Sequence, residues 1–195
     1  MQPSGALGRV FGAAMELINE SAYRAALKAI APLADENILE IGFGTGRFAE
    51  LLLGYDPSIS VAGVDPTATM VERANRRRKI RAAGARADLR QGDASSLPWP
   101  DGYFNAVVAI HSFQFWADPH RSVREILRVS GHGRRLLLVL RRHGRKAPKW
   151  LPNPLSRQGN EIRATTDFLE TAGFEVIRLP DAGSSAMLLA VTPPI

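Results

Sequence analysis

The chain has 195 residues, of which 45 % are hydrophobic and 23 % are charged, a balance ordinary for one globular domain with a substantial core. It contains no cysteine, which excludes structural disulfides, zinc–thiolate sites and a cysteine nucleophile and agrees with a reducing cytoplasm. The 25 lysines and arginines exceed the 19 acids, giving a net charge of +6, so nucleic acid, a lipid surface and an anionic metabolite are all compatible partners.

The first twenty residues carry no long apolar core and are interrupted by Arg9 and Glu16. We therefore expect neither a signal peptide nor a membrane span, and a cytoplasmic protein. No cluster with metal-ligand spacing is found, so no metal site is predicted.

Apolar runs and helical patterns alternate along most of the chain. Strands are predicted over residues 37–41, 59–65, 85–91, 104–110 and 133–141, and helices over 45–53, 67–83 and 118–129. This alternation predicts a parallel sheet covered by helices on both faces. The runs "AVVAI" and "LLLVL" are continuously apolar, which is typical of central parallel strands.

The C-terminal part follows a different pattern. "FEVIRL" (174–179) and "AMLLAV" (186–191) are separated by six residues, which is too short for the crossover that joins parallel neighbours. These two strands are therefore predicted to pair antiparallel, so that a mostly parallel α/β sheet finishes with one reversed strand. Before them, residues 142–163 hold three prolines and two glycines without a steady period, which predicts a long loop of functional importance.

A glycine-rich turn follows the first predicted strand in "NILEIGFGTGRFAE" (37–50). Arg47 stands where a dinucleotide fingerprint needs a small residue, and no Lys-Ser/Thr pair follows Gly46 as a P-loop requires. Glu40, just ahead of the turn, would repel a diphosphate and attract an ammonium group. Gly42 and Gly44 let the backbone approach a ligand and Gly46 permits close packing of the next helix, although a turn without a ligand has the same pattern.

Acids also end the next two strands. Asp65 lies 19 residues beyond Gly46, where an acid usually accepts hydrogen bonds from ribose hydroxyls. Asp93 follows the third strand and is placed to accept from an adenine amino group. Helix or turn capping is the alternative role for each acid, and a stronger alternative for Asp93 than for Asp65. Because ligands of open α/β sheets bind at the carboxyl ends of strands, Glu40, Asp65 and Asp93 are expected to converge on one crevice.

Several segments together resemble class I S-adenosylmethionine-dependent methyltransferases of the small type 11, UbiE-like branch. They are "ILEIGFGTGRF", "VAGVDPT", "GDASSLPWPDGYFNAVVAIHSFQFW", "EILRVSGHGRRLLLVL" and "FLETAGFEVIRL". The resemblance runs from residue 37 to 139 and more loosely to the C-terminus. It implies a single-domain, doubly wound, Rossmann-like sheet of seven strands, mostly parallel, with the C-terminal strand reversed.

The resemblance also implies S-adenosylmethionine as cofactor and S-adenosylhomocysteine as product. The resemblance implies a set of residues around the cofactor, in order from its methionine part through ribose to adenine: Glu40, Gly42, Gly44, Gly46, Asp65, Pro66, Asp93 and Ala94. Ile110 and His111 are expected near the sulfonium. The chain departs from the family in "GHG" at 131–133, where Pro-Gly-Gly is usual, and in the bulky Phe43. It lacks the Asn/Asp-Pro-Pro-aromatic signature, which lowers the expectation of DNA adenine or release-factor substrates.

The acceptor side has several candidate residues. His111 follows a buried strand and has an ordinary pKa near neutrality, so it is the first candidate for a general base; a histidine that only orients the backbone or lines the pocket is the alternative. Tyr23 and His143 are weaker candidates. Phe113, Phe115 and Trp116 are predicted either to line an apolar acceptor pocket or to belong to the core, and Trp150 with Leu151 to cover the acceptor.

Two basic runs are present, and a solvated face is the simplest explanation for each. Arg141, Arg142, Arg145 and Lys146 begin at the carboxyl end of the fifth strand, which also makes them candidates for an anionic substrate or a lipid headgroup surface. No organised set of aromatic stacking residues accompanies them, so nucleic acid is not favoured as a partner. The other run, "RRRK" at 76–79, lies on a predicted helix.

We therefore predict methyl transfer from S-adenosylmethionine to a small-molecule acceptor that is apolar or anionic. The alternatives are an RNA methyltransferase using the basic loop 141–146, a non-catalytic S-adenosylmethionine-binding protein and, less well supported, a nicotinamide dehydrogenase. Residues 1–195 are expected to form one domain: a helical cap (1–34), a cofactor-binding core (35–141), a substrate-side loop (142–163), and a helix with a hairpin (164–195). The sequence leaves the oligomeric state open.

Overall fold

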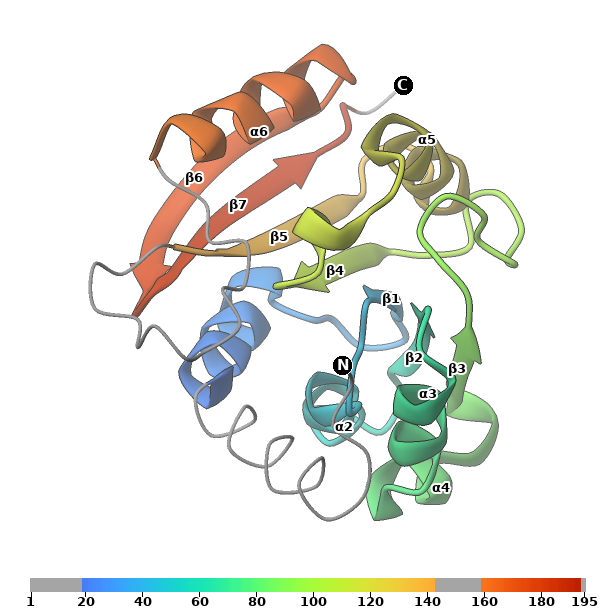
Figure 1. Ribbon diagram of the computed structural model, residues 1–195. Helices are drawn as coiled ribbons and strands as arrows, with labels where there is room; N and C mark the ends of the chain where they lie inside the picture. Colours follow the sequence, from blue (N-terminus) through green and yellow to red (C-terminus); the bar gives the residue numbers. More distant parts are fainter. Residues whose placement is uncertain (1–18, 143–158, 194–195) are drawn as a thin grey trace.

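A twisted seven-stranded sheet runs through the computed structural model, which describes residues 19–142 and 159–193 (Figure 1). The strands are β1 (Asn37–Ile41), β2 (Ser60–Asp65), β3 (Ala87–Gln91), β4 (Ala106–Ile110), β5 (Arg135–Arg141), β6 (Glu175–Ala182) and β7 (Ser185–Val191). Their order is β3-β2-β1-β4-β5-β7-β6. The first five strands pair in parallel, whereas β7 is antiparallel to both β5 and β6. The predicted α/β fold with a reversed C-terminal strand is confirmed.

Helices cover both faces of the sheet. They are α2 (Arg47–Leu53), α3 (Ala68–Asn75), α4 (Arg78–Ala83), α5 (Pro119–Ser130) and α6 (Gly159–Thr171), with helical residues 19–30 near the N-terminus and 3₁₀ turns η1 (Gly84–Arg86) and η2 (Phe113–Phe115). Side chains alternate between two cores, because successive strand residues point to opposite faces. In β4, Val107 packs in the core under α5 and α6, and Val108 in the core under α2.

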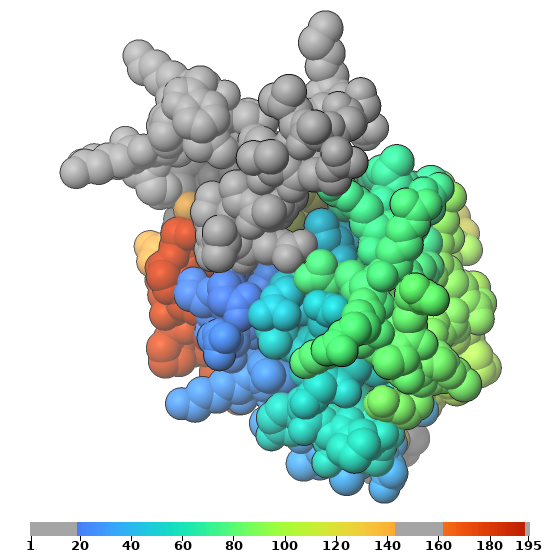
Figure 2. Space-filling model, turned by 90° about the horizontal axis from the view of Figure 1, so that it is seen from below, coloured from blue at the N-terminus to red at the C-terminus, as the bar shows by residue number. Residues whose placement is uncertain are grey.

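The helix of residues 19–30 lies between the C-terminal hairpin and α2 (Figure 2). Its apolar side buries Ala22, Ala26 and Ile30 in the same core as α2. Glu20 joins the two helices because its carboxylate accepts hydrogen bonds from Arg47 at 3.2 Å. The arginine that interrupts the dinucleotide fingerprint therefore holds this helix against the glycine turn.

The C-terminal hairpin is tighter than expected. β6 continues to Ala182 through an irregular register after Leu179, and only Gly183 and Ser184 connect it to β7. Gly183 has φ +60°, a left-handed conformation typical of two-residue hairpin turns. Arg141 pairs with Ser185 in the β5–β7 ladder, so the start of β7 lies at the same sheet edge as the end of β5.

The single helix predicted over 67–83 is wrong, since the structure has two short helices there. Arg76 ends α3, and Arg77 adopts an extended conformation (φ −66°, ψ 135°) before α4 begins. The break lets Ile80 bury beside α2, while Arg77 forms an ion pair with Glu50 at 2.9 Å. Neither glycine nor proline marks this point, so helical periodicity alone cannot show it.

The substrate-side range 142–163 is described only at its ends. Arg142 extends β5 by a bridge to Ser184, and α6 already begins at Gly159, so the last residues of that range are helical. The predicted positions 1–18 of the cap, and His143, Arg145, Lys146, Trp150 and Leu151, lie outside the described residues. Within the described ranges, every helix is too short or too polar to cross a bilayer.

Arg128 of α5 fixes the long connection from β3 to β4. Its guanidinium donates to the carbonyls of Leu97 and Trp99 at 2.9 Å and to the carboxylates of Asp101 and Glu125 at 2.8 Å. Hydrogen bonding from Arg128 lowers the pKa of Glu125 to about 2. The connection that leaves the end of β3 is thereby held to α5.

Gly46 gives a direct test of the packing behind the glycine turn. It has φ +77°, and an added Cβ would lie 2.7 Å from the Cβ of Ala74. Gly46→Ala therefore combines left-handed strain with overlap, and we expect it to lower the free energy of unfolding by about 2–4 kcal/mol in urea titration. Gly102→Ala, where φ is +67° with no atom within 4 Å, is the matched control and should cost about 1–2 kcal/mol. Equal losses in the two variants would contradict the close packing of α2 and α3.

Candidate functional site

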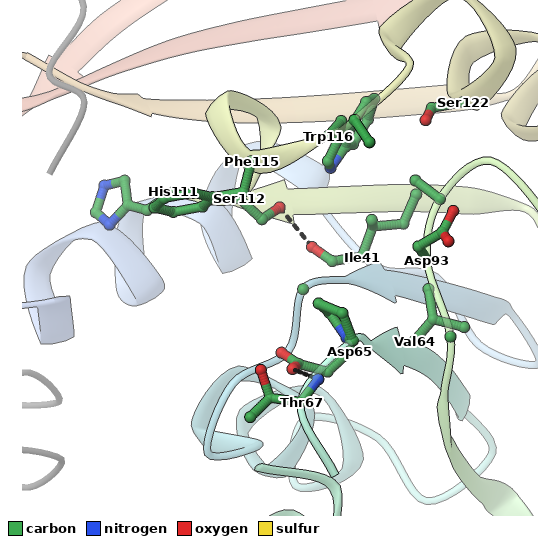
Figure 3. A pocket seen from close by; sticks show the side chains of 15 residues that line it. Ile41, Val64, Asp65, Thr67, Asp93, His111, Ser112, Phe115, Trp116 and Ser122 are labelled. Carbon is green, nitrogen blue, oxygen red and sulfur yellow. Dashed lines mark hydrogen bonds between the residues drawn. The ribbon is translucent and has the colours of Figure 1, made fainter. Parts of the chain in front are cut away.

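A cavity of about 670 Å³ opens at the carboxyl ends of the central strands (Figure 3). The cofactor residues predicted from the sequence that line it are Gly42, Asp65, Pro66, Asp93 and Ala94. His111, Phe115 and Trp116 from the predicted acceptor side also line it. The crevice expected from acids at successive strand ends is therefore present, with Asp65 and Asp93 on different sides of it.

Asp65 organises the floor of this cavity. Its carboxylate accepts from the backbone N–H of Gly44 at 2.8 Å and from that of Thr67 at 2.9 Å. The second bond stabilises the first turn of α3, where Thr67 itself provides no side-chain cap. Capping and ligand binding are therefore compatible, because each carboxylate oxygen has a second lone pair that can accept from a ligand.

Glu40 lies behind the cavity wall rather than on it. The side chain is 2 % exposed, and its Oε2 atom has no hydrogen-bond partner among the described residues. Burial and then the nearby charge of Asp65 raise its pKa to about 8, against a bond from the Ala49 N–H that favours the ionised form. A cation near the glycine turn would relieve this repulsion, and a diphosphate would increase it.

The glycines of the turn are required by different contacts. An added Cβ at Gly42 would lie 2.4 Å from the Cβ of Ser112, so this glycine makes room for the turn after β4. Gly46 is packed against Ala74 of α3, and Gly44 (φ +54°) faces open space. Phe43 points into the core, where Gly63 leaves room for its ring. Its bulk therefore does not narrow the cavity.

Asp93 forms a local turn at the opposite side of the cavity. One oxygen, Oδ1, accepts from the N–H of Ser95 at 2.7 Å and from its hydroxyl at 2.5 Å. These bonds lower the pKa of Asp93 and hold the carboxylate ionised. The described structure gives Oδ2 no partner, so one oxygen is available to a ligand.

His111 has an unusual backbone and a fully engaged ring. Its φ of +53° turns the chain directly after β4, and the ring points away from Asp65 and Asp93 toward the helix of residues 19–30 (Figure 3). Nε2 lies 2.8 Å from the Ser185 hydroxyl, and Nδ1 lies 3.3 Å from Nη2 of Arg141. Burial, followed by the charge of Arg141, lowers the pKa of His111 to about 3. This geometry favours an orienting residue over the general base expected first.

Arg141 and Arg142 are separated by the structure. Arg141 is half-buried and donates to the side-chain oxygen of Asn19 as well as to His111. Arg142 forms an ion pair with Asp181. The described part of the basic run therefore does not present two unpaired cations to a polyanion.

The remaining predicted residues divide between wall and core. Phe113 is 4 % exposed and packs against Trp116 and Phe168 at ring-centroid distances of 4.9 and 6.3 Å, so it belongs to the core. Phe115 is 66 % exposed at the cavity edge. Ile110 is buried in the core and is not part of the wall.

Ser112 is a wall residue that the sequence analysis missed. Its hydroxyl donates to the Ile41 carbonyl at 2.6 Å and joins the ends of β1 and β4. Its position depends on the left-handed His111, for which no simple sequence signal exists. Other lining residues that were missed are Ile41, Val64, Thr67, Gly92, Ala117 and Ser122; most of them adjoin the predicted acids.

Comparison with known sequences identifies the family. Residues 39–138, just over half of the chain, match the family described as "Methyltransferase domain". The chain belongs to the type 11 branch of the class I S-adenosylmethionine-dependent methyltransferases. The resemblance noted in the sequence is confirmed.

Similar proteins agree with this assignment. The demethylmenaquinone methyltransferase of Thermus thermophilus is 36 % identical over 106 residues, which are 54 % of this chain and 47 % of that protein. The chain thus spans about half the length of this relative. The uncharacterized methyltransferase YdaC of Bacillus subtilis is 27 % identical over 142 residues, 73 % of each chain. The crystal structure of a methyltransferase from Aquifex aeolicus shares the fold, with TM-score 0.72, 20 % identity, and coverage of 86 % of this chain and 88 % of that one.

The cavity of this methyltransferase fits the family's cofactor better than a dinucleotide. The unpaired oxygen of Glu40 and the nearby charge of Asp65 favour a ligand with positive charge near the glycine turn. S-adenosylmethionine carries an ammonium and a sulfonium, whereas a dinucleotide carries a diphosphate. Within the described residues, no three acidic or histidine side chains gather closely enough to hold a metal ion.

The buried carboxyl of Glu40 predicts an unusual pH dependence of stability. Because its pKa is about 8 in the folded protein and ordinarily 4.5, ionisation costs folding free energy increasingly from about pH 4.5 to pH 8. Glu40→Gln removes this cost and retains an acceptor for the Ala49 N–H. In denaturant unfolding, the free energy of unfolding of the variant relative to that of the wild type should rise by about 2–4 kcal/mol between pH 5 and pH 8.5.

The matched control is Glu72→Gln, at an exposed residue of α3 that makes an ion pair with Arg76. A Glu40→Gln difference that stays constant between the two pH values would show that this carboxyl is not held in its protonated form.

Proposed function

We propose that this chain transfers the methyl group of S-adenosylmethionine to a small-molecule acceptor at the cavity above β1, β2 and β4. The observation that supports it most strongly is the arrangement of carboxylates. Asp65 ends β2 and Asp93 follows the end of the neighbouring β3, and both line one cavity. Glu40 stands behind the glycine turn with an unpaired buried oxygen. This arrangement suits a ligand with hydroxyl and amino donors and a positive charge.

In this proposal, Asp65 accepts from the ribose hydroxyls through the lone pairs that Gly44 and Thr67 leave unused. Asp93 accepts from the adenine amino group through Oδ2. The apolar wall formed by Val64, Pro66 and Ala94 contacts the base. The methionine part lies along Gly42 and Gly44, where the ionised form of Glu40 attracts the ammonium group.

The bound cofactor supplies an electrophilic methyl group on a positively charged sulfur. The acceptor's lone pair would form the new bond to that carbon, and the electron pair of the broken carbon–sulfur bond would stay on sulfur. The chain's own residues contribute alignment and exclusion of water, for which well-oriented approach supplies about 7–11 kcal/mol of barrier reduction. Phe115 and Trp116 provide apolar surface for this purpose at the cavity edge.

The acceptor needs a lone pair that is already available. His111 stays neutral with both ring nitrogens engaged, and Asp65 and Asp93 are assigned to the cofactor. The proposed acceptor is therefore nucleophilic without proton removal by these three residues. The name of the Thermus relative refers to demethylmenaquinone, which supports a small-molecule acceptor here as well.

Asp65→Asn tests the proposed function. The amide keeps one acceptor for the backbone bonds but loses the charge, so we expect at least a tenfold weaker affinity for S-adenosylhomocysteine in calorimetry. With labelled S-adenosylmethionine and a panel of phenols, quinols, carboxylates and amines, the wild type should form S-adenosylhomocysteine in an acceptor-dependent way, and the variant much more slowly at low cofactor concentration.

Asp167→Asn, at an exposed position of α6, is the matched control and should behave as the wild type. Unchanged cofactor affinity in Asp65→Asn would refute the assigned binding site. Tight cofactor binding without turnover on any member of the panel would favour a binding protein instead.

A further inference from the structure

A polar cluster lies beside the cavity, on the side of His111 that faces away from Asp65 and Asp93. Three strands bring it together: His111 follows β4, Arg141 ends β5 and Ser185 begins β7. Asn19, from the helix of residues 19–30, completes it. Because β7 runs opposite to β5, all three strand residues lie at the sheet edge that carries the cavity.

The charge of this cluster is unbalanced within the described structure. Among the described residues, Arg141 hydrogen-bonds to the amide oxygen of Asn19 and to Nδ1 of His111, and both are neutral. Other half-buried arginines differ: Arg47 pairs with Glu20, and Arg135 pairs with Glu36. A half-buried cation without a carboxylate is costly, so an anion at this position would stabilise the site.

The orientation of the ring follows from Arg141. A guanidinium only donates, so Nδ1 of His111 accepts from it and Nε2 carries the proton that is donated to Ser185. His111 is thus fixed as a neutral spacer between the cavity and the arginine. Arg141 uses Nη2 for its two described bonds, and in the described residues Nε and Nη1 have no partner. Each of these groups can donate a charge-assisted hydrogen bond to an oxygen of an anion.

We propose that Arg141 binds a carboxylate, or an equivalent planar oxyanion, of the acceptor, beside His111 and next to the methyl-transfer cavity. The inference rests on the proposed function and narrows its acceptor to an anionic small molecule. An anionic group at this place removes the charge imbalance of the cluster.

A small anion fits this position better than a polyanion. Arg141 is half-buried under Asn19, and its neighbour Arg142 is already paired with Asp181. Nucleic-acid backbones need several accessible cations along a groove, whereas a single carboxylate needs one guanidinium.

The test compares charged and neutral probes of the same shape. Benzoate and butyrate, and their neutral amides benzamide and butyramide, are titrated into the full chain saturated with S-adenosylhomocysteine. We expect each carboxylate to bind the wild type at least ten times more tightly than its amide. Arg141→Gln should lose this preference, and Arg141→Lys, which keeps the charge but not the guanidinium donors, should retain part of it. Arg142→Gln is the matched control and should retain all of it.

Two results would overturn the inference: equal affinity of carboxylates and amides for the wild type, or a carboxylate preference that survives in Arg141→Gln. Unchanged S-adenosylhomocysteine affinity in Arg141→Gln shows that the fold is intact. If S-adenosylhomocysteine does not bind, the proposed function fails, and the same titration on the unliganded protein still decides the role of Arg141.

Discussion

The carboxylate of Asp65 is the constraint on which the site depends. By accepting from the N–H groups of Gly44 and Thr67, it ties the glycine turn after β1 to the start of α3. Burial, and then the nearby charge of Asp65, keep Glu40 in its protonated form. The glycine turn is therefore held in place, but Glu40 beside it has no positive counter-charge among the described residues, and a cationic ligand would supply one.

The turn at His111, directly after β4, shapes the opposite wall of the cavity. The left-handed His111 directs its ring toward Arg141 and places Ser112 against Gly42. Left-handed backbone at a non-glycine residue costs free energy, and such strain gathers at functional sites. Here the turn separates two regions: the cavity on the Asp65 side and the cluster around Arg141 on the other. We assign the first to the cofactor and the second to the acceptor.

Much of this arrangement was predictable because it follows from strand ends. The predicted carboxyl ends of β1 to β5 agree with the structure, and acids such as Asp65 and Asp93 adjoin those ends. Properties set by tertiary contacts were not predictable. The break at Arg77 depends on burial of Ile80 and an ion pair to α2. Periodicity could not separate the buried Phe113 from the exposed Phe115, because a 3₁₀ turn rotates them apart.

The most direct test is calorimetric titration of the wild type and Glu40→Gln with S-adenosylmethionine at pH 7, in two buffers of different ionisation enthalpy. The account predicts that the wild type binds and releases up to one proton per site, since Glu40, with a pKa of about 8, ionises when the ammonium group arrives. Glu40→Gln should bind more weakly and release none. Folded wild-type protein that does not bind S-adenosylmethionine would contradict the account.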